Sequence, residues 1–235
     1  MTNPTERAVV LQAAAIMLQY PSRDIRAQFP TIRAALTAVA PGAPRERLLD
    51  LVGQLERTPA EELEQTYVET LDRKRRCCLY LTWWSDGETR RRGLSLARLK
   101  QIYRDHGVEL LPAELPDYLP VVLEFAATVD VATGLKLLQE HRAGIELLRL
   151  ALQDISSPYA AAVEAICALL PGASPEDEAA ARALARNGPP GEMVGLDGYG
   201  NISDALGPTS LASTSPASSG SGPTFIPLES LGVRR

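Results

Sequence analysis

The sequence predicts an all-α fold arranged as a single helical bundle. Of its 235 residues 45% are hydrophobic but only 5% are aromatic, and Ala and Leu dominate, which favours helices over strands. Apolar residues recur at intervals of three and four up to about residue 187. Beyond that point Gly, Pro and Ser dominate and the periodicity ends. We expect one all-helical domain over residues 1–187 and a mostly disordered tail over residues 188–235.

The first quarter of the chain contains three predicted helical regions. A first helix ends at Pro21, and a second helical region covers residues 22–39. Pro30 should break or kink the second region, because proline lacks a backbone N–H and clashes with the preceding turn. A loop over residues 41–44 precedes a short helix over residues 45–57.

The next helix has a strong start signal. Thr58 provides a capping hydroxyl and Pro59 suits the first helical position. We expect this helix to continue as far as Trp84. Residues 77–84 have the propensity of a buried strand, but no turn separates them from the helical stretch upstream. Two i,i+4 acid–arginine pairs within residues 69–76 also favour a helix.

The second half of the chain continues the helical pattern. A turn at residues 85–87 leads into an amphipathic helix whose C-terminal cap is Gly107. A proline-rich loop over residues 112–120 leads into a helix that starts at about Asp117. The remaining predicted elements are a long amphipathic helix over residues 135–152, a helix over residues 162–170 and a more polar helix over residues 176–186.

Charge is concentrated in one region. The net charge is −5, but residues 72–105 contain ten basic and four acidic residues, so this segment carries +6 and the remainder −11. Nucleic-acid binding requires a broad basic face, so we expect no nucleic-acid partner. The acidic remainder suits a basic peptide instead.

Cellular location follows from cysteine use and hydrophobicity. Three cysteines without a pairing pattern indicate a reducing compartment. The N-terminus lacks the layout of a signal peptide. No apolar run reaches the roughly 18 residues that a membrane-spanning helix needs. We therefore expect a cytoplasmic protein without a membrane span.

No catalytic or metal-binding pattern is present. The two histidines, His106 and His141, lack CxxC or HxxxH spacing. The phosphate-binding loop, GxSxG and GxGxxG patterns are also missing. The adjacent Cys77 and Cys78 could bind a soft metal or form a strained disulfide, but two reduced thiols with one packed inward is the favoured interpretation. We expect no catalytic residue, no metal, no stably bound cofactor and no enzyme activity.

An aromatic pair lies between two arginine clusters. On a helix, Trp83 and Trp84 point about 100° apart, so one ring should enter the core and the other should be partly exposed. The exposed ring is either a peptide-contact surface or only the edge of the core. Arg90, Arg91 and Arg92 form either a solvated helix start or a salt-bridge cluster.

Two blocks of sequence resemble a known family. They read YVETLDRKRRCCLYLTWWSDGETRRRG at residues 67–93 and ELPDYLPVVLEFAA at residues 114–127. They resemble the nitrate reductase delta-subunit family, the NarJ-type molybdenum cofactor assembly chaperones, within the wider group of redox-enzyme maturation chaperones. A third segment, PPGEMVGLDGYG at residues 189–200, is similar to the closing segment of the family.

The departures from the family pattern are mild. Leu71 stands in place of phenylalanine, Trp83 and Trp84 in place of tyrosines, and Glu88 in place of aspartate. Tyr118 occupies a position where related chaperones often carry histidine. This last difference puts any histidine-based role of the loop in doubt.

The resemblance implies a helical chaperone that binds the unfinished catalytic (alpha) subunit of respiratory nitrate reductase through the N-terminal segment of that subunit. The chaperone would assist insertion of the molybdenum cofactor, molybdopterin guanine dinucleotide, into this client, and cofactor-biosynthesis proteins would be further partners. The client segment would lie in an apolar groove, with acids meeting its basic residues. The expected client-binding residues are Tyr67, Glu69, Asp72, Leu79 and Trp83 on one wall, and Glu114, Asp117, Tyr118 and Glu124 on the other.

A different class of function is the alternative. A helical enzyme or regulator would bind an anionic, nucleotide-type ligand through the arginine-rich region. The absence of a phosphate loop and of a catalytic pair of residues counts against it.

Overall fold

The computed structural model describes residues 3–110, 114–172 and 175–188, and within these ranges the regular structure is helical. The single exception is an isolated antiparallel bridge between Tyr80 and Tyr118. The predicted all-α fold is therefore confirmed. The predicted disordered tail and the third family-like segment, at residues 189–200, lie outside the described residues. The domain boundary at residue 187 stays a prediction.

Capping side chains and prolines mark the starts of the N-terminal helices. The side chain of Asn3 caps the first helix by accepting a hydrogen bond from the Thr5 backbone N–H at 3.0 Å. Pro30 is the second residue of a new helix, so the predicted break occurs just before it. The four helices are α1 (Pro4–Met17), α2 (Arg23–Ala27), α3 (Phe29–Ala38) and α4 (Ala43–Arg57).

The predicted single helix from Thr58 to Trp84 is wrong. Residues 78–80 are extended, because their chain pairs with a distant segment: the Leu81 N–H donates to the Asp117 carbonyl at 2.9 Å, and the Leu119 N–H to the Leu79 carbonyl at 2.8 Å. Tertiary pairing thus overrides local helix propensity. The observed elements are α5 (Ala60–Tyr67), the π-helix η1 (Val68–Asp72), the 3₁₀-helix η2 (Arg75–Cys77), α6 (Leu81–Asp86) and α7 (Arg90–Asp105).

The predicted long helix over residues 135–152 is also two helices, with a break at His141. Each part packs closely on a different neighbour. A Cβ on Gly134 would lie 2.1 Å from the Cβ of Ala126, and one on Gly144 would lie 2.6 Å from the Cβ of Trp84. Two separate close contacts therefore set two helix directions. The elements are α8 (Leu119–Thr128), α9 (Val131–Glu140), α10 (Arg142–Asp154), α11 (Ala160–Leu169) and α12 (Pro175–Asn187).

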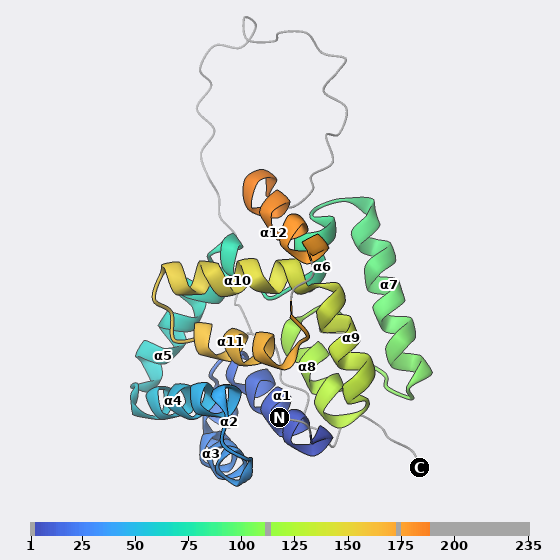
Figure 1. Cartoon of the computed structure of the whole chain (residues 1–235). Coiled ribbons are helices and arrows are strands. Elements are labelled where there is room, and N and C mark those ends of the chain that lie inside the picture. Colours follow the sequence, from blue (N-terminus) through green and yellow to red (C-terminus); the bar gives the residue numbers. More distant parts are fainter. Residues whose placement is uncertain (1–2, 111–113, 173–174, 189–235) are drawn as a thin grey trace, which may run out of the picture.

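Helix α1 lies at the centre of the bundle. It packs against α8 most extensively, and it also contacts α11, α4 and α3 (Figure 1). Three consecutive alanines, at residues 13–15, are buried in it and allow close approach of its neighbours. Helix α7 lies at the edge of the molecule beside α6. Among the described helices, none is long and apolar enough to cross a bilayer.

Candidate functional site

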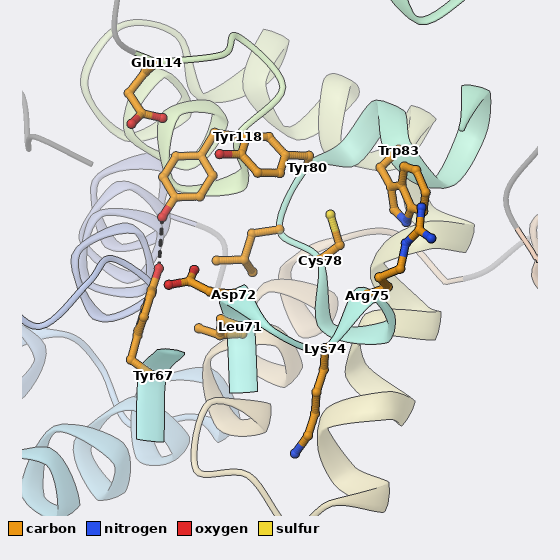
Figure 2. A pocket seen from close by; sticks show the side chains of 11 residues that line it. Tyr67, Leu71, Asp72, Lys74, Arg75, Cys78, Tyr80, Trp83, Glu114 and Tyr118 are labelled. Atoms are coloured by element: carbon orange, nitrogen blue, oxygen red, sulfur yellow. Dashed lines mark hydrogen bonds between the residues drawn. The ribbon is translucent and has the colours of Figure 1, made fainter. Parts of the chain in front are cut away.

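A pocket of about 440 Å³ opens between the segment that follows α5 and the loop that precedes α8. Figure 2 shows its side chains, which come from both family-like blocks. Its size suits a few side chains of a peptide rather than a folded domain. It is lined by Tyr67, Leu71, Asp72, Lys74, Arg75, Cys78, Leu79, Tyr80, Trp83, Glu114 and Tyr118.

The π-turn η1 shapes one wall of this pocket. The Arg73 N–H donates to the Val68 carbonyl at 3.0 Å, five residues earlier, in place of the usual four-residue step. A π-turn widens the helix and places residues five apart near one face. Tyr67 and Asp72 are separated by this interval, and both line the pocket.

Two buried tyrosines join the walls. The Tyr67 hydroxyl donates to the Leu18 carbonyl at 3.0 Å and lies 3.1 Å from the Tyr118 hydroxyl. Because the single proton of Tyr67 is used on Leu18, Tyr118 must donate to Tyr67. Burial raises the pKa of both phenols well above the ordinary value. The pair is therefore neutral, and it is anchored to α1.

Tyr80 completes an aromatic corner. Its ring centroid lies 5.3 Å from that of Tyr118, and the backbones of the two residues form the isolated bridge. Burial, followed by the negative charge of Glu114, raises the pKa of Tyr80 to about 12. The ring face is half-buried at the pocket wall.

Asp117 does not line the pocket but holds together the elements around it. Its carboxylate is fully buried and accepts hydrogen bonds from the Thr82 backbone N–H at 3.2 Å and the Thr82 hydroxyl at 2.5 Å. The Arg92 guanidinium lies 3.6 Å from the same oxygen. Asp117 therefore caps the N-terminus of α6 and ties α7 to the loop.

The two ends of the pocket carry opposite charge. Asp72 and Glu114 lie at one end, where burial raises the pKa of each carboxyl group. At the other end, the Arg75 guanidinium stacks 4.9 Å from the centre of the Trp83 ring and pairs with Glu88 at 2.6 Å. An apolar floor lies between these ends.

Six of the nine expected site residues line this one pocket: Tyr67, Asp72, Leu79, Trp83, Glu114 and Tyr118. The other three lie elsewhere. Glu69 is exposed on η1 and accepts a hydrogen bond from Gln65 at 2.8 Å. Asp117 is fully buried and does not line the pocket. Glu124 is buried on α8 beside a separate cavity of about 20 Å³, where burial raises its pKa to about 7.

Five lining residues were not anticipated from the sequence: Leu71, Lys74, Arg75, Cys78 and Tyr80. All belong to the first family-like block. Because a helix was predicted over residues 77–84, Cys78 and Tyr80 were not expected to face the same pocket. In an extended backbone, side chains two residues apart lie on the same face. The strand interpretation of residues 77–84 would therefore have placed Cys78 and Tyr80 together.

The expected burial of one tryptophan ring and one thiol is observed. Trp84 is buried and donates its indole N–H to the Cys78 carbonyl at 3.1 Å, whereas Trp83 is partly exposed. Cys77 is buried, and both adjacent thiols are free. In the described part of the chain, no group of three or more His, Cys, Asp or Glu side chains is placed to hold a metal ion.

Comparison with known proteins gives consistent matches. A family model described as nitrate reductase delta subunit matches residues 23–165. The nitrate reductase-like protein NarX of Mycobacterium tuberculosis is 40% identical over 159 residues, which is 68% of this chain and 24% of that protein.

Two further relatives carry chaperone names. The probable nitrate reductase molybdenum cofactor assembly chaperone NarJ of Bacillus subtilis is 31% identical over 168 residues, 72% of this chain and 91% of that protein. The corresponding NarJ of Escherichia coli K12 is 32% identical over 119 residues, 51% of this chain and 50% of that protein. The chain thus spans about a quarter of NarX and about nine-tenths of the Bacillus relative.

Proposed function

Because the chain belongs to the nitrate reductase delta subunit family, we propose that it is an assembly chaperone for the catalytic subunit of a respiratory nitrate reductase. The resemblance carried by residues 67–93 and 114–127 is thereby confirmed at the level of the family. In this proposal the protein is not an enzyme. It binds the unfinished catalytic subunit until the molybdenum cofactor has been inserted.

The position of the pocket is the observation that carries this proposal. It lies where the two family-like blocks meet, and both blocks fall within the matched residues 23–165. We propose that the N-terminal segment of the client occupies it. Apolar side chains would cover the floor formed by Leu71, Cys78 and Leu79, and Trp83 would extend this contact surface.

The charge at the acidic end of the pocket suits a basic peptide better than a cofactor. Molybdopterin guanine dinucleotide carries phosphates, which the carboxylates of Asp72 and Glu114 would repel. We therefore assign the cofactor to the client and the pocket to the client segment. We place this function in the cytoplasm, where the three free thiols of the chain would stay reduced. Proteins of cofactor biosynthesis are further partners in this proposal.

The arginine-rich region gives little support to the nucleotide-binding alternative. Several of its cations already have acidic partners within the chain rather than converging on one open site. The pairs are Arg75 with Glu88, Arg76 with Asp154, Arg92 with Asp117 and Arg98 with Glu140.

Co-purification tests the proposal directly. The chaperone is isolated from cells that make the catalytic subunit with or without its N-terminal segment. We expect the full-length subunit to co-purify and the truncated one to be lost. Equal recovery of both would remove the N-terminal segment from the site, and recovery of neither would contradict the chaperone role.

Calorimetry with a synthetic peptide of that segment tests the pocket. Asp72→Asn and Glu114→Gln should weaken binding, and added salt should reduce the difference from the wild type. Glu69→Gln is the matched control, because it neutralises an exposed acid only three residues from Asp72 but outside the pocket. If Glu69→Gln weakens binding as strongly as Asp72→Asn, the contact surface extends over η1, as the sequence alone predicted.

A further inference from the structure

We propose that the acidic end of the pocket is a cage for one organic cation, the ammonium of a lysine or the guanidinium of an arginine in the bound segment. The carboxylates of Asp72 and Glu114 supply the charge. The half-buried ring of Tyr80 supplies the wall, and the buried rings of Tyr67 and Tyr118 lie behind it. The inference rests on the proposed function for the source of the cation. It adds that a single basic side chain is the anchor.

The two carboxylates lack a counter-charge. Neither Asp72 nor Glu114 makes a hydrogen bond or ion pair within the described residues. Burial raises the pKa of each carboxyl group, and no neighbouring cation offsets this effect. Lys74 lines the same pocket, but its side chain points away from the Asp72 carboxylate in Figure 2. Asp72 is exposed at the rim and Glu114 is half-buried, but burial still disfavours the charged form of each, so a bound cation would stabilise both carboxylates.

The tyrosines lie beside the Asp72 and Glu114 carboxylates but do not neutralise their negative charge. The hydroxyls of Tyr67 and Tyr118 are committed to each other and to α1, which fixes the rings. The Asp72 carboxylate lies beside this hydroxyl pair in Figure 2. Burial is the main cause that raises the pKa of both phenols, and the charge of Asp72 adds a smaller contribution. Aromatic faces attract cations through the ring quadrupole. Fixed rings beside unpaired carboxylates therefore favour a cation with an apolar stem.

A further cation, Arg92, lies near Tyr80 but is committed elsewhere. The Arg92 guanidinium carbon lies 5.9 Å from the centroid of Tyr80, but this side chain interacts with Asp117 and Thr82 and does not line the pocket. It shows that the Tyr80 ring can neighbour a guanidinium group.

A metal ion is a poor alternative occupant. Calcium takes six to eight oxygen ligands and magnesium a near-octahedral set. The described residues offer two carboxylates here, and they form no cluster of three acidic, histidine or cysteine ligands. Aromatic walls suit an organic cation, which needs no complete ligand shell.

The first test uses the synthetic client peptide with the full-length chaperone. Each lysine is replaced in turn by norleucine and each arginine by citrulline, which keep length and remove charge. We expect one replacement to weaken binding by about tenfold or more, and the others to have small effects. The same replacement should have no effect on the Asp72→Asn, Glu114→Gln double variant.

Tyr80 provides a control for the aromatic wall. Tyr80→Phe keeps the ring face and should bind the parent peptide as the wild type does. Tyr80→Leu keeps apolar bulk, loses the ring face and should weaken only peptides that carry the anchoring cation. Unchanged unfolding midpoints would show that these variants remain folded.

The second test uses n-butylguanidinium alone, followed by NMR of the tyrosine ring signals. Saturable shifts that disappear in the Asp72→Asn, Glu114→Gln double variant support the cage. If these shifts occur but the peptide does not bind, the proposed function fails while the cage stands. If the peptide binds and no single cation matters, the cage is overturned while the proposed function stands. Absence of carboxylate-dependent shifts with n-butylguanidinium also overturns the cage.

Discussion

Replacing Asp117 by alanine should destabilise the fold strongly, because a fully buried carboxylate connects α6, α7 and the loop before α8. Its oxygen accepts two hydrogen bonds from Thr82, at 3.2 and 2.5 Å, and lies 3.6 Å from the Arg92 guanidinium. The change leaves the N–H and hydroxyl of Thr82 without an acceptor in a buried site. It also leaves Arg92 without its counter-charge.

The magnitude follows from these contacts. A hydrogen bond to a charged acceptor contributes about 1.5–3 kcal/mol, so the two from Thr82 together contribute about 3–6 kcal/mol. The Arg92 contact adds less than about 1 kcal/mol, because that side chain is 25% exposed and the separation is long. The other oxygen, Oδ1, is buried without a partner, which offsets part of the gain. We expect a net loss of about 3–4 kcal/mol for Asp117→Ala.

Asp117→Asn is the more informative partner variant. It keeps one oxygen acceptor but loses the charge, and its amide N–H₂ would lie where Oδ1 has no partner. We expect a loss of about 1–2 kcal/mol. Urea unfolding followed by circular dichroism measures both variants, with the slope m showing whether the transition is comparable.

Two results would refute this reasoning. An alanine variant within about 1 kcal/mol of the wild type would show that the buried contacts contribute little. A salt-sensitive loss of peptide affinity in Asp117→Asn, with unchanged unfolding free energy, would show that the carboxylate acts on the client. That second result is the one expected from sequence alone, where Asp117 was assigned to the client-binding wall.

Three further predictions concern packing, pH and the tyrosine pair. Gly144→Ala should cost about 1–3 kcal/mol, because the new Cβ would lie 2.6 Å from the Cβ of Trp84; Gly93→Ala, with nothing within 4 Å, should be neutral or stabilise its helix by up to about 1 kcal/mol in the same urea assay. Burial raises the pKa of Glu124 from 4.5 to about 7, so its contribution to stability is complete below pH 4.5 and is lost as pH rises through 7. The difference in unfolding free energy between wild type and Glu124→Gln, measured by urea unfolding, should therefore change by about 3 kcal/mol across this pH range. Unfolding free energies of the two proteins that run parallel with pH would contradict this prediction. Tyr67→Phe should cost about 1–2 kcal/mol in the same measurement, because it leaves a buried carbonyl without its donor, and an unchanged midpoint would show that water replaces the hydroxyl.

Helical periodicity and proline positions could predict most of the fold. Pro30 marks the start of a new helix, and Gly107, with a φ of 75°, ends α7 as expected. The extended residues 78–80 could not be predicted with the same ease, because what extends them is pairing with residues 117–119, far along the chain. The break at His141 has a similar cause, since close packing against two different helices sets it.

The sequence could predict where the candidate site lies, but not which of its residues are buried. Tyr67 and Tyr118 belong to the family-like blocks, and the structure brings both into one pocket. The acids were harder to place, because a carboxylate in a sequence is ordinarily a surface residue. The burial of Asp117 and Glu124 depends on tertiary neighbours that composition does not reveal. Which side chains touch the client stays a prediction.

The backbone pairing between residues 79–81 and 117–119 has a consequence for protein engineering. In the proposed function, moving client preference between relatives would require residues 67–93 and 114–127 together. A chimera that exchanges one block would join mismatched walls, because the Tyr67–Tyr118 bond and the Thr82–Asp117 bonds both cross between the blocks. The stretch between the blocks also contacts both of them, because the Tyr103 hydroxyl donates to the Pro116 carbonyl at 2.7 Å and the Ser95 hydroxyl to Asp86 at 2.6 Å, so Ser95 and Tyr103 would have to be kept in such an exchange. The two segments that form the pocket are therefore expected to change together, although they are separated in the sequence.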